Sequence, residues 1–146
     1  MSFAVDTNIL ARSIHEGHPM QQVAKTAVRI LLDRGETVCV LAQSLYEFWV
    51  IATRPSEVNG FGMSAVEAQT MLADFEKRLT LKTDRAGIYA EWKRLVTQHA
   101  VLGKNAHDAR LVAAMKVHGI THLLTFNVGD FKRFSEITTV SPNEVQ

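Results

Sequence analysis

The sequence is most constrained by a short apolar run near its start that ends in three polar residues. Residues 3–5 are Phe, Ala and Val, and residues 6–8 are Asp, Thr and Asn. So short a run is unsuited to a helix and is typical of a central parallel strand covered on both faces. The polar residues favour a turn and the start of a helix. We therefore expect Asp6 at the carboxyl end of a buried strand, where α/β sheets bind ligands, unless Asp6 only caps the helix that follows.

Four further segments have the composition of strands and alternate with helical segments. These expected strands lie at about residues 38–41, 79–82, 122–126 and 137–140. Such alternation predicts a parallel α/β sheet with right-handed crossovers. The apolar content of 47% is sufficient for one core, and no linker divides the chain. Residues 1–146 are therefore expected to form a single domain.

Composition narrows the possible functions. The formal net charge is only +1, so a polyanion would have to be bound locally rather than by a strong overall positive field. Cys39 is the only cysteine, which excludes an internal disulfide bond and a cysteine-based zinc site. No apolar run approaches the ~18 residues that span a bilayer, and no leader segment is recognisable. We expect a cytoplasmic protein with no membrane association.

Three more acidic residues stand near expected strand ends. Glu47 lies in a helix over residues 43–53 that is apolar around most of its circumference. This helix is expected to be well buried, and its carboxylate then needs a partner, which is either a base (Arg54 or another) or a bound cation. Asp108 lies in the first turn of the helix before the fourth strand, where an acid also stabilises the helix dipole. Asp130 lies in the polar turn after that strand.

These acids together predict a metal-dependent hydrolytic site. One crevice at the sheet edge can hold them all, and crowded carboxylates that offer only oxygen suit Mg²⁺ or Mn²⁺ rather than Zn²⁺. Such a cation can hold a phosphodiester oxygen and lower the pKa of an attacking water, which predicts phosphodiester hydrolysis. No Ser-His-Asp arrangement, Walker loop or Rossmann glycine fingerprint competes. His15 and His18 are interpreted as solvated loop residues.

Four segments carry the acids, in the order residues 5–10, 44–49, 107–114 and 124–131. Together they resemble the PIN-domain ribonucleases, and in particular the VapC-type toxins of bacterial toxin–antitoxin pairs. The resemblance covers nearly the whole chain. It implies a three-layer α/β/α sandwich with a mainly parallel five-stranded sheet. It also implies Mg²⁺- or Mn²⁺-dependent cleavage of RNA that leaves a 3′-hydroxyl and a 5′-phosphate.

The resemblance assigns metal ligation to Asp6, Glu47 and Asp108. Many relatives have an acid where this chain has Asn127. Asn127 would therefore be a weaker, neutral ligand. Asp130 would be an outer-shell or second-metal group, if it does not simply cap its helix.

Substrate phosphates need cations at the rim of such a site. Four basic residues flank the acids, and each can equally be an ordinary salt-bridging residue: Arg12, Arg54, Lys104 and Arg110. Thr7 and Asn8 are expected to orient Asp6 or a water molecule. With Asn127, these residues make up the expected substrate-binding set.

The resemblance further implies a homodimer and a small cognate antitoxin protein that covers the cleft. Two other functions stay open. A housekeeping nuclease that processes RNA would use the same chemistry. A receiver-like signalling module would also have acids at strand ends, but it needs a phosphoacceptor Asp after a central strand, whereas Lys82, Thr83 and Asp84 follow the third strand here.

Overall fold

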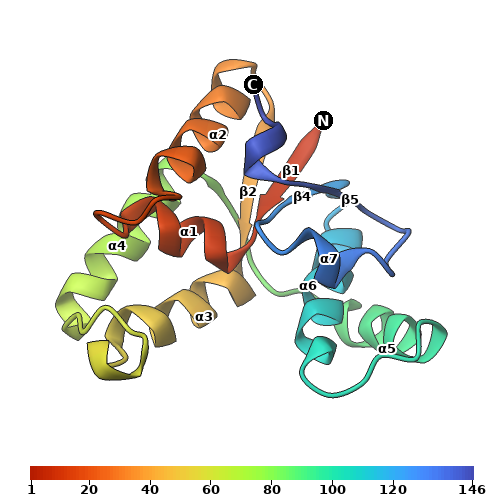
Figure 1. Cartoon of the computed structure of the whole chain (residues 1–146). Coiled ribbons are helices and arrows are strands. Elements are labelled where there is room, and N and C mark those ends of the chain that lie inside the picture. Colours follow the sequence, from red (N-terminus) through yellow and green to blue (C-terminus); the bar gives the residue numbers. More distant parts are fainter.

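The computed structural model describes residues 1–146 and contains one five-stranded sheet with helices on both faces (Figure 1). The strands are β1 (Ser2–Val5), β2 (Thr37–Leu41), β3 (Thr80–Lys82), β4 (His122–Leu124) and β5 (Thr138–Val140). Their order across the sheet is β3-β2-β1-β4-β5, and every neighbouring pair is parallel. The predicted parallel α/β sheet is confirmed.

The fourth strand is shorter than the predicted segment over residues 122–126. Its pairing with β1 and β5 ends at Leu124. The backbone N–H of Thr125 still donates to the carbonyl oxygen of Val140 (3.0 Å), but its hydroxyl donates to the carboxylate of Asp6 (2.8 Å). This side-chain hydrogen bond draws the chain out of the sheet and toward the end of β1.

Seven helices connect the strands. They are α1 (Thr7–Ile14), α2 (Gln21–Asp33), α3 (Ala42–Thr53), α4 (Ala65–Arg78), α5 (Ile88–Gln98), α6 (Asn105–Val117) and α7 (Val128–Phe131). In Figure 1, α1 to α4 lie on one side of the sheet and α5 to α7 on the other. None of the helices has the length and apolar composition needed to cross a membrane.

Alternate residues of the strands face two separate apolar cores. Phe3 and Val5 of β1 pack into the core formed with α1 to α4, whereas Ala4 packs into the core formed with α5 to α7. In β2, Val38 faces the first core and Cys39 the second. Burial on both faces explains why these strands are almost continuously apolar, and it confirms the three-layer α/β/α sandwich.

The central position of β1 decides what meets at the edge of the sheet. Ala4 lies opposite Cys39 of β2, and Val5 lies opposite Leu124 of β4. Because the three strands are parallel, the segments that follow them leave the sheet at the same edge. The sheet therefore brings together Asp6, the start of α3 and the turn after β4.

The prediction that α3 is well buried is wrong for one side of this helix. Leu45 and Phe48 are buried, but Tyr46 and Val50 are 60% and 56% exposed, and Glu47 is exposed as well. An apolar circumference does not reveal how much of it the rest of the chain covers. Glu47 is thus a surface carboxylate rather than a buried one.

Candidate active site

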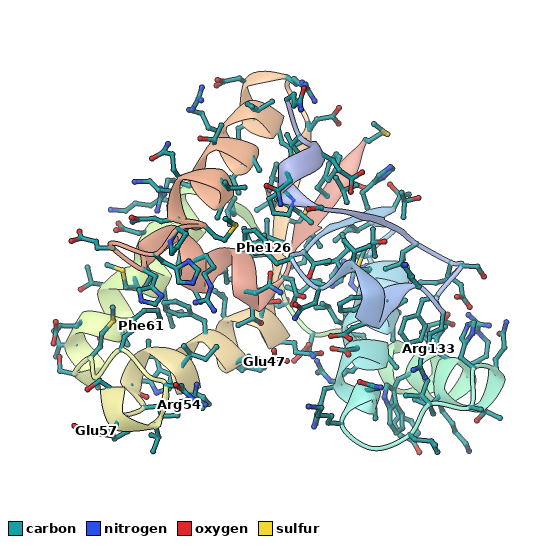
Figure 2. The ribbon with its side chains drawn as sticks, in the orientation of Figure 1. Glu47, Arg54, Glu57, Phe61, Phe126 and Arg133 are labelled. Atoms are coloured by element: carbon teal, nitrogen blue, oxygen red, sulfur yellow. The ribbon has the colours of Figure 1, made fainter.

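A cleft of about 620 Å³ opens where β1 ends and α1, α3 and α6 meet. Eight of the predicted site residues line it: Asp6, Thr7, Asn8, Arg12, Glu47, Arg54, Asp108 and Asn127. Figure 2 shows Glu47 between the helices of the two layers. Three other predicted residues, Lys104, Arg110 and Asp130, do not line the cleft. Acids from distant parts of the sequence therefore share one cleft.

Asp6 is held from both sides of its carboxylate. It is the N-cap of α1, and its Oδ1 accepts a hydrogen bond from the backbone N–H of Thr7 (2.8 Å). Its Oδ2 accepts hydrogen bonds from the hydroxyl of Thr125 (2.8 Å) and from Nδ2 of Asn8 (3.5 Å). The Oδ1 of Asn8 in turn accepts from the backbone N–H of Phe126 (3.2 Å). Asp6 thus both caps α1 and faces the cleft in a fixed orientation.

Glu47 is held by two neutral donors. Its Oε2 accepts a hydrogen bond from the hydroxyl of Thr7, and its Oε1 accepts one from Nε2 of Gln43, both at 2.9 Å. Gln43 is 7% exposed, and its Nε2 also donates to the backbone oxygen of His107 at the start of α6 (2.9 Å). No ion pair joins Glu47 to Arg54, so the alternative that these two residues neutralise each other is wrong.

Arg110 supports this arrangement from outside the cleft. Its Nη1 donates to Oε1 of Gln43 (2.8 Å), and its Nη2 donates to Asp84 (3.1 Å). Asp84 also accepts a hydrogen bond from the hydroxyl of Tyr46 (3.3 Å). Because Oε1 of Gln43 faces Arg110, the amide nitrogen must face Glu47. Arg110 is thus a salt-bridging residue in this structure rather than part of the cleft wall.

Burial and mutual repulsion raise the pKa of two carboxyl groups in the cleft. The pKa of Asp6 is raised above 3.8 mainly by burial, with smaller contributions from the charges of Glu47 and Asp130. The pKa of Asp108 is raised from 3.8 to about 6, first by burial and then by the charges of Asp6, Asp130 and Glu47. These acids are close enough to repel one another, which indicates an excess of negative charge.

Two polar residues after β4 differ in their relation to the cleft. Asn127 lines it, and no side-chain hydrogen bond from Asn127 caps α7. Asp130 is exposed on α7, close enough for its charge to raise the pKa of Asp6 and of Asp108. Asn127 can therefore contact a ligand of the cleft directly, whereas Asp130 acts on it at longer range.

Several residues of the cleft wall were not predicted from the sequence. His15, interpreted above as a solvated loop residue, lies directly after α1 and lines the cleft, whereas His18 does not. Helical spacing contained this signal, because Asn8, Arg12 and His15 fall on one face of a helix. Phe61 also lines the cleft. No local pattern indicated its position, which depends on the fold of the loop after α3.

The carboxylates of the cleft fit a hard divalent cation, but they do not form a preassembled cage. Asp6, Glu47 and Asp108 offer only oxygen atoms, which Mg²⁺ and Mn²⁺ prefer. No group of three His, Cys, Asp or Glu side chains is placed to hold one ion. Mg²⁺ is commonly bound by one or two carboxylates and keeps several water molecules. Two carboxyl groups with raised pKa values are suited to that kind of binding.

A parallel α/β sandwich with an acidic cleft at the carboxyl end of its central strand defines a class of domain suited to cation-dependent chemistry on an anionic substrate. The sequence model of the PIN domain matches residues 3–137. The chain therefore belongs to the PIN domain family.

Similarity to known proteins extends over nearly the whole chain. Ribonuclease VapC48 of Mycobacterium tuberculosis is 25% identical over 144 residues, which is 97% of this chain and 98% of the relative. VapBC2 from Rickettsia felis, solved bound to a DNA fragment from its promoter, has a TM-score of 0.74 at 17% identity and covers 97% of this chain and 98% of its own. A toxin–antitoxin complex from Klebsiella pneumoniae has a TM-score of 0.64 at 19% identity, with coverage of 95% and 96%. These solved structures share the fold of this chain.

Proposed function

We propose that this protein is a divalent-metal-dependent endoribonuclease and the toxin of a toxin–antitoxin pair. The observation that carries the proposal is the meeting of Asp6, Glu47 and Asp108, from three different elements, in one cleft. Membership of the PIN domain family and similarity to a protein named as a ribonuclease support RNA as the substrate.

Asp6 and Asp108 would hold Mg²⁺ or Mn²⁺, with Glu47 as the third acid. When bound, such a cation neutralises a substrate phosphate and lowers the pKa of an attacking water. The chain's own residues supply orientation. Thr7 and Gln43 fix both oxygens of Glu47, so this carboxylate is presented in one position when the substrate enters.

Positive charge in the cleft would be used to bind the substrate. Arg12 and Arg54 line the same cleft as the acids and can neutralise a substrate phosphate there. Asn127 adds a neutral amide that can donate a hydrogen bond to the substrate. Lys104, exposed just before α6, would act only as a distant charge.

Substitution of the acid at the end of β1 tests the proposal. Purified protein should cleave RNA in Mg²⁺ or Mn²⁺, and Asp6→Asn should lower the rate by roughly 100-fold or more, because it removes a charge that holds the cation. The readout is the appearance of fragments on a denaturing gel. Asp33→Asn, an exposed acid on α2 outside the cleft, is the matched control and should keep the wild-type rate. Undiminished cleavage by Asp6→Asn would refute the assignment.

The proposal includes a small antitoxin and a homodimer. One of the similar structures is described as a toxin–antitoxin complex, which supports a protein partner for this chain. The exposed apolar side of α3, with Tyr46 and Val50, is the kind of surface that protein contacts cover, and it supports self-association. Growth arrest on expression, relieved by the product of a neighbouring short reading frame, would separate a toxin from a housekeeping RNA-processing nuclease.

The receiver-like alternative is wrong. Receiver domains have the strand order 2-1-3-4-5, whereas this sheet has the order β3-β2-β1-β4-β5. The chain also matches the PIN domain over residues 3–137.

A further inference from the structure

The outer end of the cleft contains two arginines that have no acidic partner. Arg12 lies on α1, and Arg54 directly follows α3. Neither forms an ion pair with a carboxylate. Arg54 donates from Nη2 to the backbone oxygen of Asn59 (2.8 Å), while its Nε is buried and has no hydrogen-bond partner. Nη1 of Arg12 lies 3.4 Å from Nδ1 of His15. Two guanidinium groups that have no carboxylate partner in one cleft are suited to bind an anion.

Helix geometry separates these cations from the acids. Glu47, Ile51 and Arg54 line the cleft from one face of α3 and its end, and Asn8, Arg12 and His15 do so from α1. Arg54 is two helical turns beyond Glu47, a distance of roughly 10 Å along the axis. The cleft therefore has an acidic inner end at the sheet and a basic outer end, spaced by about the length of a few nucleotides of a stacked strand.

An aromatic side chain closes the basic end. Phe61 lines the cleft, and its ring meets the ring of His15 edge to face, with centroids 5.1 Å apart. Figure 2 shows Phe61 and Arg54 in the same region of the molecule. The loop is held against the end of α3, because the N–H of Phe61 donates to the oxygen of Ile51 and the N–H of Gly62 donates to that of Arg54 (3.0 and 2.9 Å). These hydrogen bonds therefore fix the position of Phe61 before any ligand binds.

The ring of His15, which meets Phe61, also contacts the ring of His18, with centroids 4.9 Å apart. Partial desolvation lowers the pKa of His18, and the positive charges of Arg12 and His15 lower it further. No acid contributes to that shift. An anionic ligand at the outer end of the cleft would therefore relieve this repulsion.

We propose that the outer end of the cleft binds one nucleotide of a single-stranded RNA, a few nucleotides along the strand from the cleaved bond. Its phosphate would lie between Arg12 and Arg54, and its base would stack on Phe61. The inference rests on the proposed function for the identity of the substrate, but it concerns binding and not cleavage. Stacking on an aromatic ring together with a phosphate contact is how single strands are held without base pairing.

Measuring RNA binding in the presence of a chelator tests this pocket separately from catalysis, because no divalent cation is then available. A short fluorescein-labelled single-stranded RNA is titrated with the full chain in EDTA, and an abasic strand of the same length is titrated in parallel. Phe61→Ala should weaken binding of the RNA about 10-fold and leave binding of the abasic strand unchanged, because only the first has a base to stack. Arg12→Gln and Arg54→Gln should weaken both, and each should reduce the slope of log affinity against log salt by roughly 0.7.

Matched controls lie on the other side of the molecule. Tyr89→Ala removes an aromatic ring that is 70% exposed on α5, and Arg133→Gln removes an exposed arginine seen far from Phe61 in Figure 2. Both should bind the RNA as the wild type does. Phe61→Trp should restore affinity, which shows that a stacking surface, and not the fold of the loop, is required.

Three outcomes would contradict the proposed pocket. The first is that Phe61→Ala binds the RNA with wild-type affinity, and the second is that Phe61→Ala loses as much affinity for the abasic strand as for the RNA. The third is that the protein binds an acidic peptide more tightly than the RNA, through the arginines and without Phe61. A protein that cuts RNA normally but shows any of these has the proposed function without this pocket. A protein that binds as expected but never cuts has the pocket without the proposed function.

Discussion

At the scale of single residues, Asp108 shows how the cleft stores unfavourable charge. Its pKa is raised from 3.8 to about 6 in the folded chain, mainly because it is partly buried and secondly because other acids surround it. The folded state therefore holds the Asp108 proton more tightly than the unfolded state does. Between those two pKa values, each increase in pH favours unfolding.

This linkage gives a prediction for stability in the absence of divalent cations. The free energy of unfolding should fall as pH rises from about 4 to about 6, and Asp108→Asn should remove that part of the fall. At neutral pH the variant should then unfold a few degrees above the wild type, with no difference below about pH 4. Calorimetry in EDTA measures this, with Asp33→Asn as an exposed control. A variant less stable than the wild type at neutral pH would contradict the explanation.

At the scale of secondary structure elements, Gln43 and Arg110 connect the two helices that carry the outer acids. Gln43 on α3 bonds Glu47 and the start of α6, and Arg110 on α6 bonds Gln43 in return. The position of Glu47 relative to Asp108 therefore depends on contacts between helices that pack on opposite faces of the sheet.

We predict that Arg110→Met or Gln43→Met lowers the cleavage rate by about 10–100-fold, the usual effect of losing a group that orients a metal ligand. Because both act through one hydrogen-bond chain, the double variant should be little worse than either single variant. Tyr46→Phe, which removes only the exposed hydrogen bond to Asp84, is the control and should keep the wild-type rate. Additive losses in the double variant would show that the two residues act independently.

The loop after α3 depends on a glycine for steric reasons. A Cβ on Gly60 would lie 1.8 Å from the carbonyl oxygen of Arg54, whereas a Cβ on Gly129 of α7 would meet nothing within 4 Å. We predict that Gly60→Ala lowers the free energy of unfolding by about 1–3 kcal/mol, and that Gly129→Ala leaves it unchanged or slightly raised. Urea denaturation measures both. Equal stability of the two variants would mean that the loop has room to adjust.

The sequence allowed the elements to be predicted better than their contacts. Strands and acids followed from local patterns, since apolar runs and strand-end polar residues are visible within a few positions. The hydrogen bonds that hold Asp6 and Glu47 could not be predicted from local patterns. Thr125 lies 119 residues from Asp6, and Arg110 lies 67 residues from Gln43, which holds Glu47. The prediction that the helix around Glu47 is buried was wrong for the same reason, because burial depends on which surfaces the rest of the chain covers.

At the scale of the whole molecule, the cleft joins the two layers of the sandwich. Glu47 comes from the layer of α1 to α4, Asp108 comes from the layer of α5 to α7, and Asp6 lies between them at the end of the central strand. The layers have separate apolar cores, and acids from both layers line one cleft at the edge of the sheet.

A cation shared between the layers should therefore stabilise the folded chain. We predict that saturating Mg²⁺ or Mn²⁺ raises the unfolding temperature by several degrees over that in EDTA, since ligand at about 100 times its dissociation constant adds about 2.7 kcal/mol. Asp6→Asn should lose most of this rise, and Asp33→Asn should keep it. Identical unfolding temperatures with cation and with chelator would show that no cation binds to the folded chain under these conditions.

The central position of β1 also sets the point during synthesis at which the cleft can be completed. A ribosome completes β1 early, but its neighbour β4 and the hydroxyl that anchors Asp6 are added more than a hundred codons later. Until those residues leave the exit tunnel, the nascent chain has no finished sheet and no assembled pocket. The acidic cleft is therefore completed only when nearly the whole chain has been synthesised.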